Sequence, residues 1–279
     1  MNLSRLKRLL VGRGSPTQAA FLALARLGQV RFESCLAVDG HRLHARTSDR
    51  ALALLLHRLG LADTAEKRWL SENARPGMTC LDIGANIGIY TLYLARLAGP
   101  AGRVVAFEPE PENFDLLEKN VIANGYGNVE CVRKAVSDRA GTADLGFCEE
   151  NRGDHRLGGQ GRSTVAVETL RLDDYFPPAS RVDVIKMDIQ GSELGAMEGM
   201  RRLLRDNPGV QIVAEFCPSL IEAAGGSAEA FPAFWRAEGF KAFLLSEGLR
   251  PVSLEDASSF MDMGRNQGYL NVLLRRLRD

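Results

Sequence analysis

Apolar and polar positions change their period repeatedly along most of the chain. Short β-prone apolar runs are followed by stretches in which apolar residues recur every three or four positions, the spacing of one helix face. Alternation of this kind predicts an α/β protein with a mainly parallel sheet and right-handed crossovers. The strands expected from the pattern are 79–83, 104–107, 129–136, 182–187, 210–216, 240–245 and 269–274, and the helices are 89–98, 111–124, 192–204 and 228–238.

The N-terminal quarter follows a different pattern, which predicts a mostly helical extension. Asp39 and Gly40 separate two alternating runs, the signal of a two-residue β-hairpin turn. We therefore expect an extension of helices plus a hairpin over 1–75 and a larger domain over 76–279. The helices expected in the extension are 3–10, 21–27, 48–59 and 64–73.

The segment between the third and fourth expected strands is too long for a simple crossover. Segments 142–148 and 164–169 have the composition of strands, and 149–163 between them is rich in glycine and almost free of apolar residues. We expect an inserted loop or hairpin at about 139–180. Its centre contains His155, and it is either a lid that closes over bound ligands or a solvated loop.

The composition of the chain excludes some classes of function but does not indicate one. The chain has 35 basic and 35 acidic residues, so no net charge draws it to nucleic acid or to an anionic membrane. Its five cysteines show no C-x-x-C spacing, which favours reduced thiols over disulfides or a zinc site. No apolar run approaches the roughly 18 residues of a membrane span. The basic N-terminus fits an amphipathic helix better than a signal peptide, and we expect a cytoplasmic protein.

The residues TCLDIGANIGIY, at 79–90, carry the clearest chemical signal. An apolar strand ends here in a glycine-rich turn that leads into a helix, so backbone N–H groups at the helix start face any bound ligand. The turn places Gly84, Asn86 and Gly88 as candidate cofactor-binding residues. Glu108 ends the next expected strand, the position from which a carboxylate binds two ribose hydroxyls.

The turn differs from a dinucleotide-binding loop. Asn86 stands where the middle glycine of G-x-G-x-x-G clears room for a pyrophosphate, and Asp82 precedes the first glycine by two positions. A carboxylate there repels a pyrophosphate but suits a cationic ligand such as the sulfonium of S-adenosyl-L-methionine (SAM). An ordinary strand-to-helix turn without a ligand is the alternative interpretation.

Acidic residues recur at the ends of the expected strands. In an open α/β sheet the carboxyl ends of the strands meet at one edge, where ligands bind. The residues at or near that edge are Asp82, Glu108, Asp138, Asp188 and Glu215.

Several blocks together resemble the FkbM family of SAM-dependent methyltransferases. The blocks are LDIGANIGIYTLYLA (81–95), VVAFEPEPENFDLLEKN (104–120), KAVSDRAGTADL (134–145), TLRLDDYF (169–176) and VDVIKMDIQGSELGAMEGM (182–200). The resemblance covers about 75–216, and it implies a class I, Rossmann-like methyltransferase sheet with helices on both faces. The first seventy or so residues carry no part of it.

The resemblance also implies roles for individual residues. Asp82 and Gly84 would lie beside the methionine part of SAM, Glu108 on its ribose, and Ser137 or Asp138 near the adenine. Asp188 would lie close to the transferred methyl group. One position departs from the family, which commonly reads K-I-D-V-E-G where this chain reads KMDIQG (186–191). Gln190 replaces the glutamate, so any role of that residue would pass to Asp188 or Glu193.

The function we expect is O-methylation of a small or medium-sized hydroxylated acceptor of the sugar, lipid or polyketide type. The candidates for the base that takes the hydroxyl proton are His155 and Asp188. A Mg²⁺ ion held by Asp188 and Glu215 is a less favoured alternative, and we expect no metal. A nicotinamide-dependent oxidoreductase and a non-catalytic SAM-binding or scaffold protein are rival hypotheses, although no Tyr-x-x-x-Lys pair supports the first. Self-association of the chain is left open.

Overall fold

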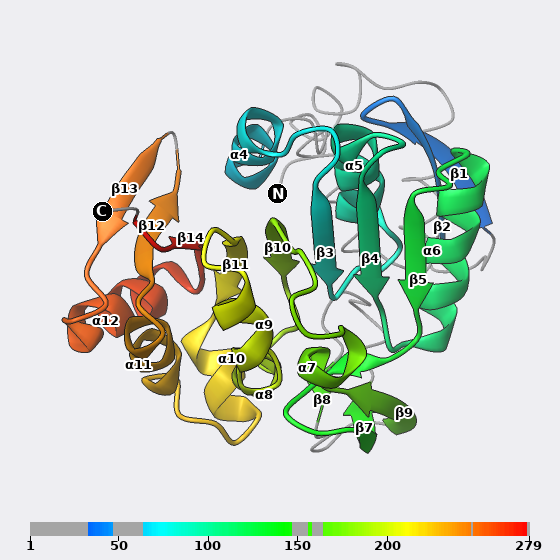
Figure 1. The fold of residues 1–279 in the computed structure, drawn as a ribbon. Helices are drawn as coiled ribbons and strands as arrows, with labels where there is room; N and C mark the ends of the chain where they lie inside the picture. Colours follow the sequence, from blue (N-terminus) through cyan, green and yellow to red (C-terminus); the bar gives the residue numbers. More distant parts are fainter. Residues whose placement is uncertain (1–32, 47–63, 147–155, 158–163, 247, 278–279) are drawn as a thin grey trace, which may run out of the picture.

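An eight-stranded sheet crosses the centre of the protein (Figure 1). The computed structural model describes residues 33–46, 64–146, 156–157, 164–246 and 248–277. The strands lie in the order β13 (Leu249–Val252), β12 (Lys241–Leu245), β14 (Leu270–Arg275), β11 (Gln211–Phe216), β10 (Val184–Met187), β3 (Thr79–Ile83), β4 (Arg103–Phe107) and β5 (Val129–Val132). The five strands from β11 to β5 are parallel, and β14 is antiparallel to both neighbours. The mainly parallel α/β sheet predicted from the sequence is confirmed.

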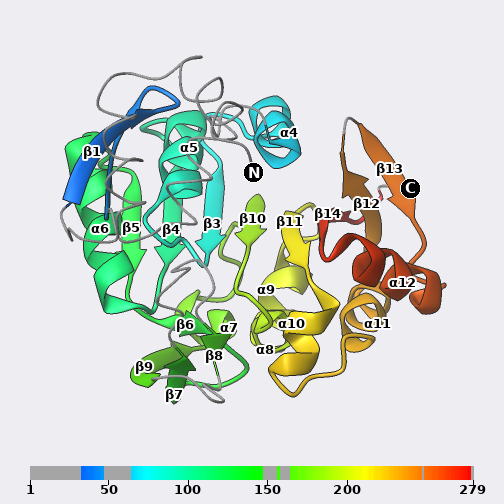
Figure 2. The ribbon, with the colours of Figure 1, turned by 180° about the vertical axis from the view of Figure 1, so that it is seen from behind.

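Helices cover both faces of the sheet (Figures 1 and 2), because successive strand residues point to opposite sides. In β3, Cys80 packs in a cluster with Leu94 on one face, and Leu81 packs in a cluster with Trp235 on the other. The first face carries α4 (Ala65–Asn73), α5 (Ile89–Ala98) and α6 (Pro111–Ala123). The second carries α7 (Leu172–Tyr175), α8 (Glu193–Glu198), α9 (Arg201–Asp206), α10 (Pro218–Ala223), α11 (Ala230–Ala237) and α12 (Ala257–Gln267).

The prediction of one strand over 129–136 is wrong. The backbone turns after β5, where the N–H of Lys134 donates to the carbonyl of Val132 at 3.0 Å. The next two residues form β6 (Ala135–Val136), which belongs to a second sheet. A local turn therefore divides an apolar run that periodicity treats as continuous.

The prediction of one helix over 192–204 is also wrong. The helix divides into α8 and α9 around Gly199, where an added Cβ would lie 2.0 Å from the carbonyl oxygen of Ser137. The carboxylate of Asp173 accepts hydrogen bonds from the backbone N–H groups of Arg202 and Leu203, at 3.0 and 2.9 Å. A residue distant in sequence thus provides the start of α9 with the partners that a helix N-terminus needs.

The inserted segment forms a small sheet of its own. Its strands lie in the order β6, β9 (Thr164–Leu170), β7 (Gly141–Gly146) and β8 (Arg156–Leu157). β7 and β9 are antiparallel over six residue pairs, from Gly141 opposite Thr169 to Gly146 opposite Thr164. Both strands were predicted, whereas 149–155 and 158–163, with His155, lie outside the described residues. The proposal that 149–163 is a lid stays a prediction.

The predicted N-terminal hairpin is present as β1 (Glu33–Val38) and β2 (His41–Arg46), and it is held by α6. The side-chain amide of Asn124 accepts from the N–H of Arg42 at 2.8 Å and donates to its carbonyl at 2.7 Å. Asn120 binds the N–H and carbonyl of His44 in the same way, at 2.5 and 3.0 Å. The two asparagines therefore replace a neighbouring strand along this edge of β2.

Only some of the remaining predictions for the N-terminal part fall on described residues. The helix expected at 64–73 is α4, whose first turn is capped by the Thr64 hydroxyl at 3.2 Å from the N–H of Lys67. The helices expected at 3–10, 21–27 and 48–59 lie outside the described residues, and the division at residue 75 stays a prediction. None of the helices in the described ranges is both long and apolar enough to cross a membrane.

Candidate functional site

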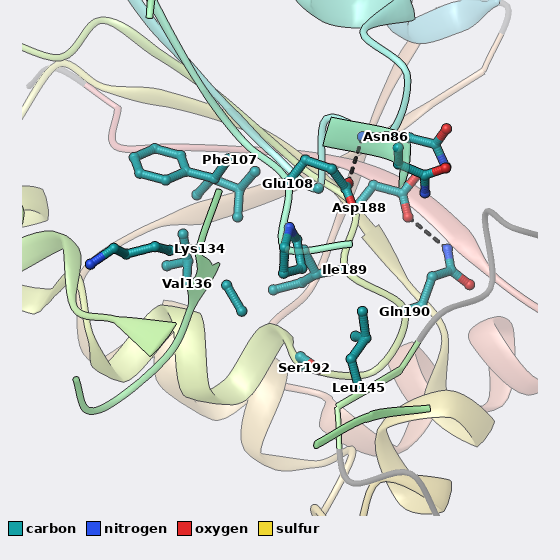
Figure 3. A pocket seen from close by; sticks show the side chains of 15 residues that line it. Asn86, Phe107, Glu108, Lys134, Val136, Leu145, Asp188, Ile189, Gln190 and Ser192 are labelled. Carbon is teal, nitrogen blue, oxygen red and sulfur yellow. Dashed lines mark hydrogen bonds between the residues drawn. The ribbon is translucent and has the colours of Figure 1, made fainter. Parts of the chain in front are cut away.

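A pocket opens at the carboxyl ends of β3, β4 and β10, the edge at which the sequence places its acidic residues (Figure 3). Gly84, Asn86, Glu108 and Asp188, all predicted site residues, line it. They come from three different strand ends, so the parallel sheet brings together residues that are up to 104 positions apart. The close-up shows Asn86, Glu108 and Asp188 grouped along one side.

The turn after β3 approaches β10 very closely. Gly84 has φ +84°, and an added Cβ would lie 2.0 Å from the carbonyl oxygen of Asp188. The backbone N–H groups of Gly84 and Ala85 both donate to the carbonyl of Phe107 at 3.0 Å, which joins the turn to β4 as well. Only glycine fits this position, where the backbone is left-handed and a neighbouring backbone fills the side-chain space.

Glu108 is a buried carboxylate held by the backbone. Its two oxygens accept hydrogen bonds from the N–H groups of Asn86, at 2.8 Å, and Glu110, at 3.0 Å. The side chain is only 6% exposed, and this burial raises the pKa of Glu108 to about 7 against the opposing effect of the two hydrogen bonds. The carboxylate is thus oriented by donors that do not depend on any side chain, and its remaining lone pairs are available to ligand hydroxyls.

Asp82 lies behind the pocket rather than on its surface. It is 2% exposed and accepts a hydrogen bond from the Thr91 hydroxyl of α5 at 2.6 Å. Burial raises the pKa of Asp82 to about 6, although the bond from Thr91 and the charge of Lys186 oppose the rise. Its predicted contact with the methionine part of SAM remains a prediction, and its observed role is to join the start of α5 to β3.

Apolar side chains also line the pocket: Phe107 of β4, Val136 of β6, Leu145 of β7 and Ile189 after β10. They are spread around it, since Phe107 and Val136 lie beside Lys134, and Leu145 lies beside Ser192 (Figure 3). The sequence analysis assigned none of them to the site, because apolar residues at strand ends have the same composition as core residues. Leu145 could have been found only by knowing that the inserted segment folds back onto the sheet.

A network of side chains surrounds Asp188. Gln190 donates through its amide to Asp188, at 2.7 Å, and to Glu215, at 3.2 Å. The ammonium of Lys186 lies 3.6 Å from the second oxygen of Asp188 and 5.0 Å from the centre of the Tyr90 ring. Burial alone would lower the pKa of Lys186, but Asp188, Tyr90, Asp82 and Glu215 together raise it, so this lysine is charged.

This network is a poor cation site. The positions around Asp188 that a cation would need are taken by an ammonium group and an amide N–H₂. Within the part of the chain that the structure describes, no three His, Cys, Asp or Glu side chains converge as metal ligands do. The donor set therefore does not fit the Mg²⁺ ion that the sequence left as an alternative.

Glu215 and Glu193 differ in what they can contribute. Burial and the charge of Asp188 raise the pKa of Glu215 to about 7. Burial raises the pKa of Glu193 to about 7 as well, but its carboxylate turns back to the N–H of Gly191 at 3.1 Å. Gln190 thus connects Asp188 with Glu215, whereas Glu193, which the sequence offered as a substitute for the missing glutamate, binds its own helix start.

The other predicted site residues lie around the pocket without lining it. Gly88, with φ +93°, is the N-cap of α5 and lies against Leu117. Ser137 donates to Asp138 at 3.0 Å, and the pair packs against Gly195 and Gly199 beside α8. Neither residue lines the pocket, so their proposed place near the adenine stays a prediction. The same holds for His155, which is outside the described residues.

The arrangement fits SAM better than a dinucleotide. Glu108 offers a carboxylate to two vicinal hydroxyls, the apolar side chains of the pocket suit a purine, and the carboxylate of Asp188 would repel a pyrophosphate. Comparison with known proteins agrees: the model of the methyltransferase FkbM domain matches residues 82–242. The chain belongs to the FkbM methyltransferase family.

Curated relatives within and around the family match parts of the chain. The methyltransferase sdnD of Sordaria araneosa is 30% identical over 43% of this chain and 59% of its own length. The hexuronic acid methyltransferase AglP of Haloferax volcanii is 29% identical over 50% of this chain and 56% of its own length. The 31-O-demethyl-FK506 methyltransferase FkbM of Streptomyces tacrolimicus is 42% identical over 26% of this chain and 27% of its own. The chain thus spans less than two thirds of these relatives.

Among solved structures, the methyltransferase FkbM from Methylobacillus flagellatus KT superposes loosely, with a TM-score of 0.45. It is 16% identical, and the superposition covers 91% of this chain and 57% of the other.

Proposed function

We propose that this FkbM-family protein transfers the methyl group of SAM to a hydroxyl oxygen of a small or medium-sized acceptor. The observation that carries the proposal is Glu108, whose carboxylate is fixed by two backbone N–H groups at the end of β4, beside the Gly84 turn. This geometry suits the two hydroxyls of a ribose, and the nearby carboxylate of Asp188 disfavours a pyrophosphate.

The relatives support a hydroxylated acceptor. One acts on a hexuronic acid and another on 31-O-demethyl-FK506, and both substrates carry hydroxyl groups. We extend only this shared chemistry to the present chain. The acceptor is then a sugar-, lipid- or polyketide-type molecule with a free hydroxyl, and its identity is the first result that an experiment should provide.

The residues of the chain would act mainly by alignment. The cofactor supplies a methyl group on a positively charged sulfur, so the protein has to bring an acceptor oxygen into line with that methyl and exclude water. Asp188 would accept the hydrogen bond of the acceptor hydroxyl. Gln190 and Lys186 hold one oxygen each of this carboxylate, and its other lone pairs can still bind a hydroxyl.

Two groups are proposed as the proton acceptor. Asp188 borders the pocket, and Glu215, which shares the amide of Gln190 with it, has a pKa raised to about 7, close to the value that suits a base at neutral pH. His155 remains a third candidate from the sequence.

The first test is cofactor choice. We expect calorimetry to show S-adenosylhomocysteine (SAH) binding in the micromolar range, roughly −8 kcal/mol, and NAD binding far more weakly. Incubating the protein with a cell extract and methyl-labelled SAM should then give a labelled metabolite by mass spectrometry.

Each outcome separates the hypotheses. NAD binding as tight as that of SAH would favour an oxidoreductase. Tight SAH binding without any labelled product would favour a non-catalytic SAM-binding protein. In the labelled product, release of the methyl group as methanol under mild base would indicate an ester, and a stable ether would support transfer to a hydroxyl.

A further inference from the structure

One face of the large sheet changes from apolar to polar toward the edge at which the pocket lies. On this face the strands pack against α4 through a buried cluster that contains Val184, Val213 and Leu273 of the strands and Trp69 and Leu70 of α4. Two positions nearer the edge, the same face carries Lys186 of β10, Glu215 of β11 and Asn271 of β14, because alternate residues of a strand share a face. Glu215 lies directly opposite Asn271. Polar side chains of three adjacent strands therefore meet on this face.

The first turns of α4 and α5 reach this polar part of the face. The ring centre of Tyr90, in α5, lies 5.0 Å from the ammonium of Lys186. The hydroxyl of Tyr90 is 3.3 Å from the hydroxyl of Thr64, the N-cap of α4. Glu66 belongs to the first turn of α4, so the helix of the N-terminal part brings a carboxylate to the same region.

Glu66 is a buried carboxylate without a partner. It is 7% exposed, and no hydrogen bond or ion pair joins its side chain to another residue in the described parts of the chain. It lies close to Tyr90, whose pKa is raised to about 12 by burial and by the charge of Glu66. A carboxylate withdrawn from water needs hydrogen-bond donors. For Glu66 these donors have to come from solvent or from a bound molecule.

Tyr269 and Asn271 lie beside these carboxylates at the start of β14. Tyr269 is 51% exposed, and burial of the remainder together with the charges of Glu215, Glu66 and Asp188 raises its pKa. The side-chain amide of Asn271 is partly exposed and has no hydrogen-bond partner among the described residues. An exposed aromatic ring thus stands next to an amide and carboxylates that can still form hydrogen bonds.

This combination of groups matches a sugar. The C–H groups on the face of a pyranose pack against an aromatic ring such as that of Tyr269. The hydroxyls around its edge donate to carboxylates, as Glu66 and Glu215 offer, and accept from an amide, as Asn271 offers. The groups also lie near Asp188, since the amide of Gln190 binds both Asp188 and Glu215 and lies on the side of Asp188 away from Glu108 (Figure 3).

The charges of the region limit the kind of sugar. Lys186 lies 3.6 Å from Asp188 and balances that carboxylate. Lys67, which follows the unpaired glutamate in α4, forms an ion pair with Asp39. No ion pair within the described residues reaches either Glu66 or the glutamate of β11. A carboxylate or phosphate on the acceptor would therefore be repelled.

We propose that Glu66, Tyr269 and Asn271 form, with Glu215, a subsite that binds the methyl acceptor beside Asp188, and that this subsite takes an uncharged sugar rather than a uronic acid or a phosphorylated sugar. The inference rests on the proposed function, since an acceptor hydroxyl has to reach Asp188. It narrows the acceptor to neutral molecules of the sugar type. It also gives α4, which precedes the family match at 82–242, a part in acceptor recognition.

The first measurement is the charge of the methylated product. A cell extract is incubated with the protein and methyl-labelled SAM, residual SAM is removed on a cation exchanger, and the remainder is passed over an anion exchanger at pH 8. We expect the labelled product to pass through both resins and to give an O-methylated monosaccharide on acid hydrolysis. A labelled product retained by the anion exchanger, or one that contains no methylated sugar, would overturn the proposal.

The second measurement is the KM for the unmethylated form of that product. We expect the acceptor KM to rise about 10–100-fold in Glu66→Gln and about 3–10-fold in Tyr269→Ala, with kcat and SAH affinity within about twofold of the unmutated protein. Two controls should keep the unmutated KM: Glu72→Gln, the same change at an exposed position of α4, and Tyr269→Phe, which retains the ring.

The results separate the possible failures. An unchanged acceptor KM in either Glu66→Gln or Tyr269→Ala would overturn the subsite, and so would a parallel loss of SAH affinity, which would indicate a general loosening of the protein. If Glu66→Gln does not fold, Tyr269→Ala decides, because a half-exposed side chain can be removed without opening the core. Failure of the unmutated protein to bind SAH or to give any labelled product would overturn the proposed function instead.

Discussion

The two carboxylates that line the pocket are held by different means. Glu108, the proposed partner of the ribose, is bound by backbone N–H groups from the same βαβ unit and is almost fully buried. Asp188, the proposed partner of the acceptor, is half-buried and is bound by the side chains of Gln190 and Lys186. Backbone donors persist when side chains are substituted, whereas a side-chain network changes with a single substitution. The position of Glu108 is therefore fixed by the backbone, whereas that of Asp188 depends on two neighbouring side chains.

The largest effect is expected at Gly84, where the turn after β3 touches the chain after β10. Replacing Gly84 by alanine places a Cβ 2.0 Å from the carbonyl oxygen of Asp188 in a left-handed backbone conformation. We expect the free energy of unfolding to fall by more than about 3 kcal/mol and SAH binding to be lost. Denaturant unfolding and calorimetry measure the two effects.

Gly127 provides the control for this substitution. It has no atom within 4 Å of an added Cβ, and its φ is not in the left-handed region. Gly127→Ala should retain stability and SAH affinity. Normal SAH binding by Gly84→Ala would show that the close contact between Gly84 and the backbone of Asp188 is unnecessary for binding.

A substitution at Asp188 should affect methyl transfer rather than cofactor binding. If Asp188 receives the acceptor hydroxyl, Asp188→Asn should lower the rate of methyl transfer by about 10²–10⁴-fold, with little change in SAH affinity. The measurement is label transfer to the acceptor found by mass spectrometry, with His155→Ala and Glu215→Gln assayed in parallel. A large loss only in His155→Ala would assign the base to the inserted segment, and a large loss only in Glu215→Gln would assign it to β11.

A smaller effect is expected at Glu108. Glu108→Gln keeps the shape of the side chain but removes a charged acceptor for the ribose hydroxyls. We expect SAH to bind about 1.5–3 kcal/mol more weakly, with Glu118→Gln, on the exposed side of α6, as the control. Equal SAH affinity of Glu108→Gln and the unmutated protein would show that the ribose does not bind this carboxylate.

The raised pKa of Glu108 extends this prediction to pH. Ribose hydroxyls bind the ionised carboxylate, so SAH affinity should decrease as the pH falls below about 7, and Glu108→Gln should lose this dependence. In the ligand-free protein the same shift favours folding below a pH of about 4.5, and this contribution is lost as the pH rises through about 7. The variant should therefore show a flatter pH dependence of the unfolding free energy in that window.

Periodicity predicted most of the large sheet, because its strands are short apolar runs separated by helices with an apolar face. It failed where a distant residue decides the structure. The division between α8 and α9 depends on Asp173 and on the approach of Ser137 to Gly199, neither of which changes the local spacing of apolar residues. The turn at Lys134 likewise interrupts a run whose composition is uniformly strand-like.

The site was predictable to the extent that it is local in sequence. The turn at Gly84 and Asn86 and the carboxylate of Glu108 belong to one βαβ unit, and the structure brings them into one pocket. Asp188 was predicted to lie beside them because the carboxyl ends of parallel strands meet at one edge of the sheet. Leu145 was not predictable, because its place depends on how the inserted sheet packs, and its apolar character marks it only as a buried residue.

The attachment of the N-terminal hairpin to α6 depends on a match between the rise of one helical turn and the rise of two strand residues. Four residues of a helix advance about 6 Å, and two residues of a strand advance about 6.6 Å, so Asn120 and Asn124 match residues 44 and 42 almost without adjustment. The two asparagines therefore bind every second residue of a strand, and the strand can shift along the helix only by two residues at a time. An asparagine repeated after one helical turn could hold any extended segment in this way, whatever its side chains, since both bonds are made to the backbone.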